Sequence, residues 1–310
     1  MKAARTASTT YRFLSSHLAA WLIFTNAVSA AYSVRRLVLG YNGAIMRVRN
    51  GTNNAEGDVA FDEANRIGAN GVVTITAQGT SAWTVGSTIA LSTFYSGASV
   101  FVKTWYDQSG NGRDVANTTA GTQPRLVNAG TLEAINGRPA VNYPTTMMTL
   151  TSSARVVNSI NEYAALYIGT SQANNATPFS LNGSNTGQRL AMHVPEGTSI
   201  MSDLASSATA YVRQTGTWGL SYNTGYMMSQ LNSVTSNLRQ VRLNGAVNVT
   251  TTATNWATDV TQGTLQLGGT LYGATYAFTG KFSEFVVMAT GVAATNTALE
   301  AGSKAYFGTP

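Results

Sequence analysis

The chain of 310 residues contains no cysteine. Without a thiol it can form no disulfide bond, no thiolate nucleophile and no cysteine-ligated metal centre. Its two histidines, His17 and His193, are too few for a histidine-based metal cluster. A calcium ion held by Asp, Asn and backbone oxygens stays an open alternative, because it needs neither residue type. We therefore expect no cofactor, with calcium as the one exception to test.

Charged residues are also scarce, at 10% of the chain, with 19 Lys and Arg against 13 Asp and Glu. A nucleic-acid-binding surface needs a basic stripe interleaved with aromatic residues. The one candidate stripe consists of Arg35, Arg36, Arg47 and Arg49. We interpret these arginines as structural residues that pair with acids, so no nucleic-acid partner is predicted.

The first thirty residues carry a basic leader, an apolar run at residues 18–24 and then the small residues Val28, Ser29 and Ala30. This order is typical of a signal peptide, and the apolar run is too short to span a bilayer. The alternative is a retained arm that packs on neighbouring subunits, because exposed apolar side chains gain free energy on burial. We favour the retained arm, whose docking residues would be Leu14, Leu18, Trp21, Leu22 and Phe24.

Residues 31–310 show no proline-rich linker, charge block or internal repeat that would mark a domain boundary. Large β-rich domains often exceed 200 residues as one unit. The chain is accordingly divided into an N-terminal arm or signal-like segment, residues 1–30, and one domain, residues 31–310.

Residues 102–114 form the most informative stretch of the chain. Alternation from Val100 to Tyr106 predicts a strand with Val100, Val102 and Thr104 on one face and Trp105 on the other. A polar turn follows, in which side chains cap their own backbone and glycines tolerate positive φ. We therefore predict a strand and a tight structural turn, Trp105, Tyr106, Asp107, Gln108, Ser109, Gly110, Asn111 and Gly112.

The C-terminal half has its own β signals. Residues 240–247 place Asn244 and Gly245 between two apolar strands, which is typical of a β-hairpin. Further strands are predicted at residues 264–267 and 276–288, and a closing helix at residues 293–306.

The turn motif and the segments at residues 31–37, 41–43, 45–49, 53–61, 123–127 and 136–143 together resemble the arabinofuranosidase B catalytic-like family. The resemblance implies an all-β fold: a concanavalin A-like, jelly-roll type antiparallel β-sandwich with an N-terminal arm and a short C-terminal helix. It also implies the form of the domain that occurs in phage and large-virus proteins. The chain departs from the fungal enzymes of this family, which have a vicinal cysteine pair at the substrate pocket. Fold is better determined than activity by such a resemblance.

Catalysis is not expected from the carboxylates. A retaining glycosidase needs two carboxylates about 5 Å apart, and no pair here aligns with the acid and nucleophile segments of the fungal enzymes. Asp107 and Asp114 belong to the turn motif and are interpreted as caps. Catalytic residues are therefore predicted to be absent, and an arabinofuranosidase-like hydrolase is the enzymatic alternative.

Sugar binding rests on an aromatic cluster, Trp218, Tyr222, Asn223 and Tyr226. These residues could stack against sugar rings, whereas the simpler interpretation is a strand with buried large side chains. Three function classes remain: a structural virion protein of capsid or tail, of the minor capsid or decoration type; a secreted glycan-binding or glycan-cleaving protein; and a cell-surface adhesion module. We favour the virion protein, localised in the virion and partnered by other capsid subunits, with glycan binding as an added property and secretion as the alternative localisation.

Overall fold

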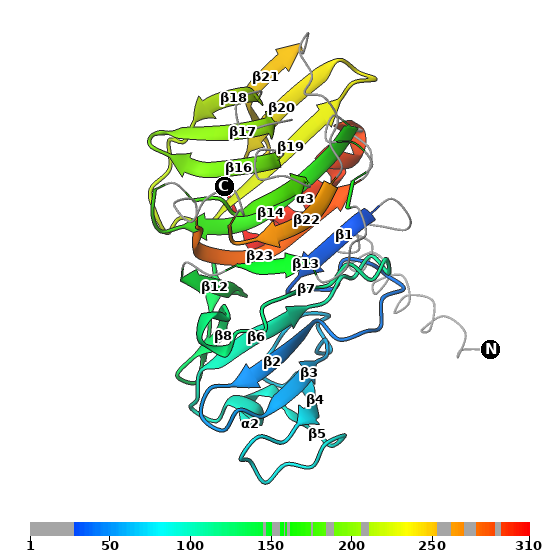
Figure 1. The fold of residues 1–310 in the computed structure, drawn as a ribbon, viewed down its shortest axis with the longest axis vertical. Coiled ribbons are helices and arrows are strands. Elements are labelled where there is room, and N and C mark those ends of the chain that lie inside the picture. Colours follow the sequence, from blue (N-terminus) through cyan, green and yellow to red (C-terminus); the bar gives the residue numbers. More distant parts are fainter. Residues whose placement is uncertain are drawn as a thin grey trace, which may run out of the picture.

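A computed structural model describes residues 28–144, 147–150, 156–157, 159, 162–174, 176–183, 189–205, 211–252, 262–269, 277–288 and 293–310. Its strands form two regions, one built from residues 46–128 and one built mainly from the later chain (Figure 1). The predicted arm residues, Leu14, Leu18, Trp21, Leu22 and Phe24, lie outside the described residues.

The first region is an antiparallel meander in the order β6, β2, β3, β4, β5. Its strands are β2 (Met46–Asn50), β3 (Glu56–Val59), β4 (Val72–Ala77), β5 (Thr88–Ala90) and β6 (Val100–Trp105), and a short helix, α2 (Leu91–Tyr95), joins β5 to β6. Burial alternates along β2: Met46 and Val48 are buried, whereas Arg47 and Arg49 are half-exposed. This period of two is that of a strand with one face on a core.

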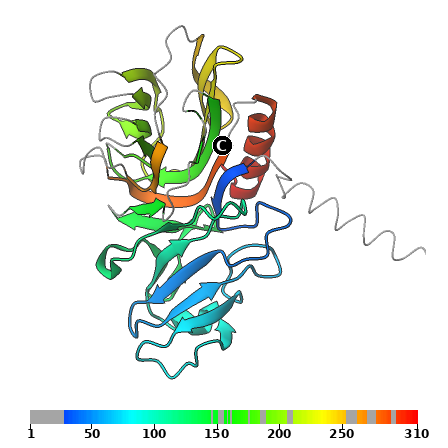
Figure 2. The ribbon, with the colours of Figure 1, turned by 45° about the vertical axis from the view of Figure 1, so that its right-hand side comes forward.

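The second region has two facing layers (Figure 2). The first layer pairs β1 (Val28–Ser33) and β12 (Val141–Pro144) with β23 (Thr279–Met288), and continues through β14 (Glu162–Ser171), β19 (Tyr226–Ser233), β20 (Leu238–Leu243) and β21 (Ala246–Thr252). The second layer runs from β13 (Met148–Leu150) through β22 (Gln262–Leu267), β15 (Phe179–Gly183), β16 (Arg189–Glu196) and β17 (Ser199–Ala205) to β18 (Tyr211–Thr217). Side chains meet between the layers, where the rings of Phe179 and Phe285 lie 4.5 Å apart.

Both layers connect to the first region through β6. On one side, β6 pairs with β7 (Val115–Ala116), which pairs with β13 of the second layer. On the other side, β6 pairs with β8 (Arg125–Asn128), which meets β12 of the first layer. Three short elements complete the connection, η1 (Ala120–Thr122), β9 (Thr131–Leu132) and the hairpin of β10 (Ala134–Ile135) with β11 (Arg138–Pro139). The result is the predicted antiparallel β-sandwich.

The C-terminal helix α3 (Ala293–Phe307) packs on β14 and β19, on the outer side of the first layer (Figure 2). It buries Leu299, Ser303 and Tyr306, which are spaced by three and four residues and so share one helix face. No helix in the described ranges is long and apolar enough to cross a membrane.

Several local predictions are confirmed. Asn244 and Gly245 both have positive φ, 53° and 82°, between β20 and β21, as a two-residue hairpin turn requires. Gly110 and Gly112 in the turn motif also have positive φ. The predicted arginine pairing is confirmed for Arg35 with Glu284 and for Arg47 with Asp58.

The predicted alternation along residues 100–106 is wrong at its second half. Pairing of β2 with β6 shifts register between Arg47 and Val48, where Val102 and Thr104 oppose consecutive residues and Lys103 is the extra residue. Such a bulge moves the following side chains to the opposite face. Trp105 is consequently fully buried with Val100 and Val102, while Thr104 and Tyr106 are half-buried.

Candidate functional site

The turn motif is a structural clamp on β1. Asp107 Oδ1 accepts hydrogen bonds from the backbone amides of Ala31 and Ser109, both at 2.9 Å, and Oδ2 accepts from the amide of Arg113 at 3.2 Å. The next residue, Gln108, accepts from the Leu37 amide and donates to the carbonyls of Ser33 and Arg35. The predicted capping of the Ser109 amide by Asp107 is therefore confirmed, and the clamp extends to the first strand.

The predicted aromatic cluster is divided between core and surface. Trp218 and Tyr226 are buried, with rings in edge contact at 4.9 Å, and the Tyr226 hydroxyl lies 2.8 Å from Ser171 Oγ. Tyr222 is 46% exposed and Asn223 is exposed, in a turn where Asn223 has φ of 65°. The four residues therefore do not form one exposed aromatic platform, and only Tyr222 and Asn223 can reach a ligand.

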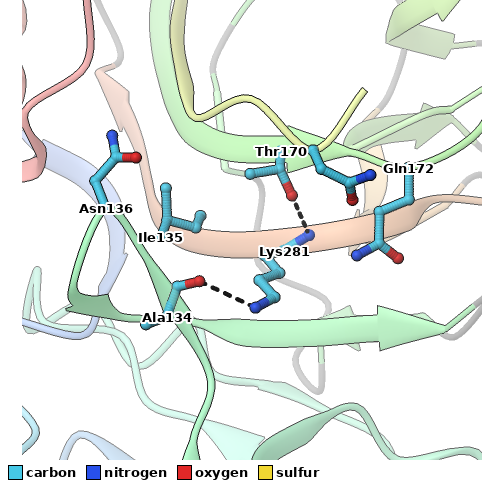
Figure 3. Close-up of a pocket in the computed structure, with 7 residues that line it drawn as sticks. Ala134, Ile135, Asn136, Thr170, Gln172 and Lys281 are labelled. Carbon is cyan, nitrogen blue, oxygen red and sulfur yellow. Dashed lines mark hydrogen bonds between the residues drawn. The ribbon is translucent and has the colours of Figure 1, made fainter. Parts of the chain in front are cut away.

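Asn223 lines a small polar pocket of about 180 Å³, which we name the Lys281 pocket. Figure 3 shows Lys281 between the β10–β11 turn on one side and Thr170 and Gln172, at the end of β14, on the other, whereas the side-chain amide of Asn136 points away from Lys281. Its lining comes from four segments of the chain and comprises Ala134, Ile135, Asn136, Thr170, Gln172, Asn223 and Lys281. Sequence analysis identified Asn223 only, because the other residues carry no motif.

The Lys281 side chain is fixed by oxygen acceptors. Its ammonium donates to the Ala134 carbonyl at 3.0 Å (Figure 3). It also lies 3.0 Å from Glu133 Oε2. Glu133 Oε1 also accepts from Arg125 Nε and Nη2, at 2.9 and 2.7 Å. One carboxylate is thus shared by two cations, so the cluster of Lys281, Glu133 and Arg125 has a formal charge of +1.

The backbone around the pocket is held in place by local conformation. Asn136 and Gly137 both have positive φ, which closes the β10–β11 hairpin, and Asn136 Nδ2 donates to the carbonyls of Phe307 and Gly308. On the opposite wall, the Asn223 amide donates to the Ser171 carbonyl at 2.8 Å. At Gly225, a Cβ atom would lie 2.8 Å from Ile135 Cγ2 and 3.0 Å from Asn136 Nδ2, so a larger residue would require these side chains to shift.

His193 belongs to a buried polar chain elsewhere in the second layer. Its Nδ1 lies 2.8 Å from Thr177 Oγ1, and its Nε2 lies 3.7 Å from Asp203 Oδ2. Burial acts to raise the pKa of Asp203, but hydrogen bonds with Arg213 and His193 outweigh it and hold that pKa well below the usual range. Since Thr177 and Asp203 are fully buried and both Asp203 oxygens bind Arg213, this chain of contacts is not a Ser-His-Asp type hydrolytic site.

The buried carboxylates of the described residues all have structural partners, which are amides for Asp107 and cations for Glu133, Asp203, Glu284 and Glu300. A glycosidase nucleophile must be available to the sugar. Nor do three or more Asp, Glu or His side chains cluster as metal ligands in the described part of the chain. These buried carboxylates therefore have structural roles.

Comparison with solved structures identifies arabinofuranosidases as fold neighbours. An arabinofuranosidase complexed with arabinofuranosyl-α-1,2-xylobiose is 16% identical with a TM-score of 0.59. A GH54 α-L-arabinofuranosidase soaked with a cyclic sulfate inhibitor is 16% identical with a TM-score of 0.60. In both cases the match covers 89% of this chain and 62% of the other, so the chain spans less than two thirds of those enzymes.

Neither a protein-family model nor a curated protein sequence matches the chain. At such low identity the structural neighbours show the fold alone, and they confirm the predicted likeness to arabinofuranosidases at that level. Neither of these two enzymes gives evidence of a phage or viral role for this chain.

Proposed function

We propose that this protein binds carbohydrate in the Lys281 pocket and does not cleave it. The observation that carries the proposal is the convergence of Thr170, Gln172, Asn223 and Lys281 on one small hollow, with Asn136 at its edge. Amides, hydroxyls and an ammonium supply both donors and acceptors, which is the mixture that a sugar's hydroxyl groups can use. The fold neighbours include a complex with a saccharide, which agrees with this class of ligand.

The size of the pocket limits the ligand. A volume of about 180 Å³ is below the roughly 300 Å³ at which typical small-molecule pockets begin. We therefore expect one terminal sugar unit to enter, with the rest of the glycan lying outside. Tyr222, which is 46% exposed beside Asn223, is available to contact that outer part.

Binding can be tested with a double variant, Asn223→Gly with Gln172→Ala. Glycine keeps the positive φ at position 223, and Gln172 is exposed, so the fold should be retained. Removing two ligand hydrogen bonds of about 0.5–1.5 kcal/mol each should weaken binding about tenfold. Calorimetric titration of saccharides identified on a glycan array provides the measurement.

The matched control is Asn42→Ala, at an exposed asparagine in the first region. It should bind like the unmodified protein. Equal affinity of the double variant and the control would overturn the proposed site. Release of arabinose from an aryl arabinofuranoside by the purified protein would overturn the absence of cleavage and favour the hydrolase.

An assembly role in a virion remains our second proposal, and it rests on the apolar residues of the N-terminal arm. Among the described residues the hydrophobic core begins at Ala30. Because β1 begins at Val28, a test should delete residues 1–27 and keep the strand intact. The expected product is a folded protein that fails to join particles, measured by sedimentation. Full assembly of the deleted protein would contradict this role.

A further inference from the structure

A second hollow lies in the first region, where the β2–β3 turn meets the end of α2. Its volume is about 360 Å³, twice that of the Lys281 pocket, and none of its lining side chains is charged. We name it the Trp83 hollow. It shares no lining residue with the Lys281 pocket, so its possible ligand must be inferred from its own aromatic and polar contacts.

Aromatic rings form one wall of this hollow. The half-buried Trp83 is stacked on Phe94, with ring centroids 5.3 Å apart and planes inclined by 23°. Phe94 is fully buried, so its ring packs on one face of the indole and restricts the orientation of Trp83. Tyr95, also half-buried, adds a second aromatic residue to the lining.

The polar rim is pre-organised. Asn50 Oδ1 accepts from the amides of Thr52 and Asn53, and its Nδ2 donates to the Phe94 carbonyl at 2.7 Å. The Asn50 side chain therefore ties the β2–β3 turn to the end of α2. Thr52, Asn53 and Ser96 consequently line the hollow from backbones held together before any ligand arrives, which reduces the entropy lost on binding.

A third segment closes the frame. Gly79 has φ of 58°, and a Cβ atom there would lie 2.1 Å from the Asn53 carbonyl oxygen. Only glycine permits that approach, and the Thr80 amide then donates to the same carbonyl at 2.8 Å. The segment that leads to Trp83 is thereby anchored on the turn that carries Thr52 and Asn53.

We propose that the Trp83 hollow is a second carbohydrate-binding site, selective for a neutral sugar ring. The apolar face of such a ring packs on an indole, while its edge hydroxyls bond to the amide and hydroxyl groups of Asn53, Thr52 and Ser96. The uncharged lining provides no counter-ion for an acidic sugar, in contrast to the cationic Lys281 pocket.

A sugar fits this place better than a protein partner. A standard protein interface buries about 800 Å² on each side and has an apolar centre. Of the described large apolar side chains that are exposed, Val85 alone lies in the segment next to Trp83. The hollow therefore offers one concave aromatic wall and no extended apolar surface.

The test compares Trp83→Leu and Trp83→Phe with the unmodified protein. Saturation-transfer NMR with neutral and acidic mono- and oligosaccharides identifies the ligand, and titration gives the affinity. Leucine should still cover Phe94 but lacks an aromatic face, so neutral-sugar affinity should fall tenfold or more. Phenylalanine should retain most of it. Melting temperature and circular dichroism establish that both variants are folded.

Thr52→Ala provides a variant outside the aromatic stack and should reduce affinity by two- to fivefold even if Trp83→Leu does not fold. The double variant Asn223→Gly with Gln172→Ala should leave neutral-sugar binding at the Trp83 hollow unchanged, which separates this site from the Lys281 pocket. Full affinity in Trp83→Leu, or in Thr52→Ala when Trp83→Leu is unfolded, would overturn the proposal. Saturation transfer to acidic sugars, with none to neutral sugars, would also overturn the proposal.

Discussion

Two buried arginines at different places in the sandwich are held in opposite ways. Arg35, 2% exposed, follows β1 where the two regions join, and its guanidinium pairs with Glu284 at 2.9 Å. Arg239, 1% exposed, lies in β20 near the far side of the first layer, and its Nε and Nη2 have no hydrogen-bond partner within the described structure. Burial lowers the pKa of Arg239, which means that its surroundings disfavour the charge.

The Arg35 site links three elements. Glu284 in β23 accepts from both Arg35 and Ser33 Oγ, and Arg35 Nη2 also donates to Ser303 in α3. The Arg35 guanidinium lies 4.8 Å from the ring centroid of Tyr306, also in α3. At this joint, an ion pair and hydrogen bonds link the end of β1, β23 and α3. The Nε and Nη2 atoms of Arg239 make no such link to another element within the described structure. The comparison predicts that loss of Arg35 costs more stability than loss of Arg239, because it leaves the buried Glu284 carboxylate without its cation.

The largest effect is expected for Arg35→Met. It leaves the Glu284 carboxylate buried without its cation, which should lower the free energy of unfolding by about 3–5 kcal/mol. Urea denaturation provides the measurement. The half-exposed pair of Arg47 and Asp58 supplies the control, since Arg47→Met should change stability by less than about 1 kcal/mol. Equal losses in both variants would show that the joint is no stronger than a surface pair.

A smaller loss is expected for Asp107→Ala. The carboxylate accepts hydrogen bonds from three backbone amides and from Ser109 Oγ. Its removal leaves these donors, in the turn and in β1, without an acceptor. We expect a loss of about 2–3 kcal/mol, because hydrogen bonds to charged groups contribute about 1.5–3 kcal/mol each and water can replace part of them. Glu63→Ala, at an exposed carboxylate, is the control and should be neutral in the same assay.

Asp203 should make stability depend on acid pH. Its pKa in the folded protein is lower than in the unfolded chain, where it is about 3.9. The folded state then binds fewer protons, so this contribution is present above about pH 4 and is lost as the pH falls toward the folded-state pKa. Asp203→Asn should therefore lose less stability than the unmodified protein between pH 5 and pH 2. Parallel curves from the two proteins would contradict the ion pair with Arg213.

The smallest effect, and one of opposite sign, is expected for Arg239→Met. Methionine keeps most of the side-chain volume and removes a buried charge without an ion pair in the described structure, so stability should stay equal or rise by about 1 kcal/mol. Thermal melting measures the change. A loss as large as that of Arg35→Met would mean that the Arg239 guanidinium has a partner in solution, such as a bound anion.

Local features could be predicted because their signals are contained in a few neighbouring residues. Asn244 with Gly245 specifies a hairpin turn, and Asp107 with Gly110 and Gly112 specifies a capped turn, since positive φ and side-chain capping are short-range properties. The closing helix was likewise predicted from spacing within residues 293–306 and is present as α3. The overall sandwich followed from the resemblance that these local motifs carry.

The residues of the candidate site could be predicted only in part. The sequence identified Asn223, but Trp218 and Tyr226 are core residues. Their buried rings are in edge contact with each other, and the Tyr226 hydroxyl lies against Ser171 Oγ. The bulge at Lys103 was likewise invisible in the alternation, since it arises from pairing with β2. In each case a partner distant in sequence decides which face of the chain is buried.

The sequence by itself therefore determined the class of fold, the turns and the absence of thiol chemistry, all of which depend on residue type and short spacing. Tertiary structure alone brought residues 134–136, 170–172, 223 and 281 to one pocket, and stacked Trp83 on Phe94 beside the β2–β3 turn. The Lys281 pocket depends on strand order and register, which place segments more than a hundred residues apart side by side, and the Trp83 hollow joins separate segments within residues 50–98. No local pattern encodes that proximity, because the contacts form only when the layers close on their common core.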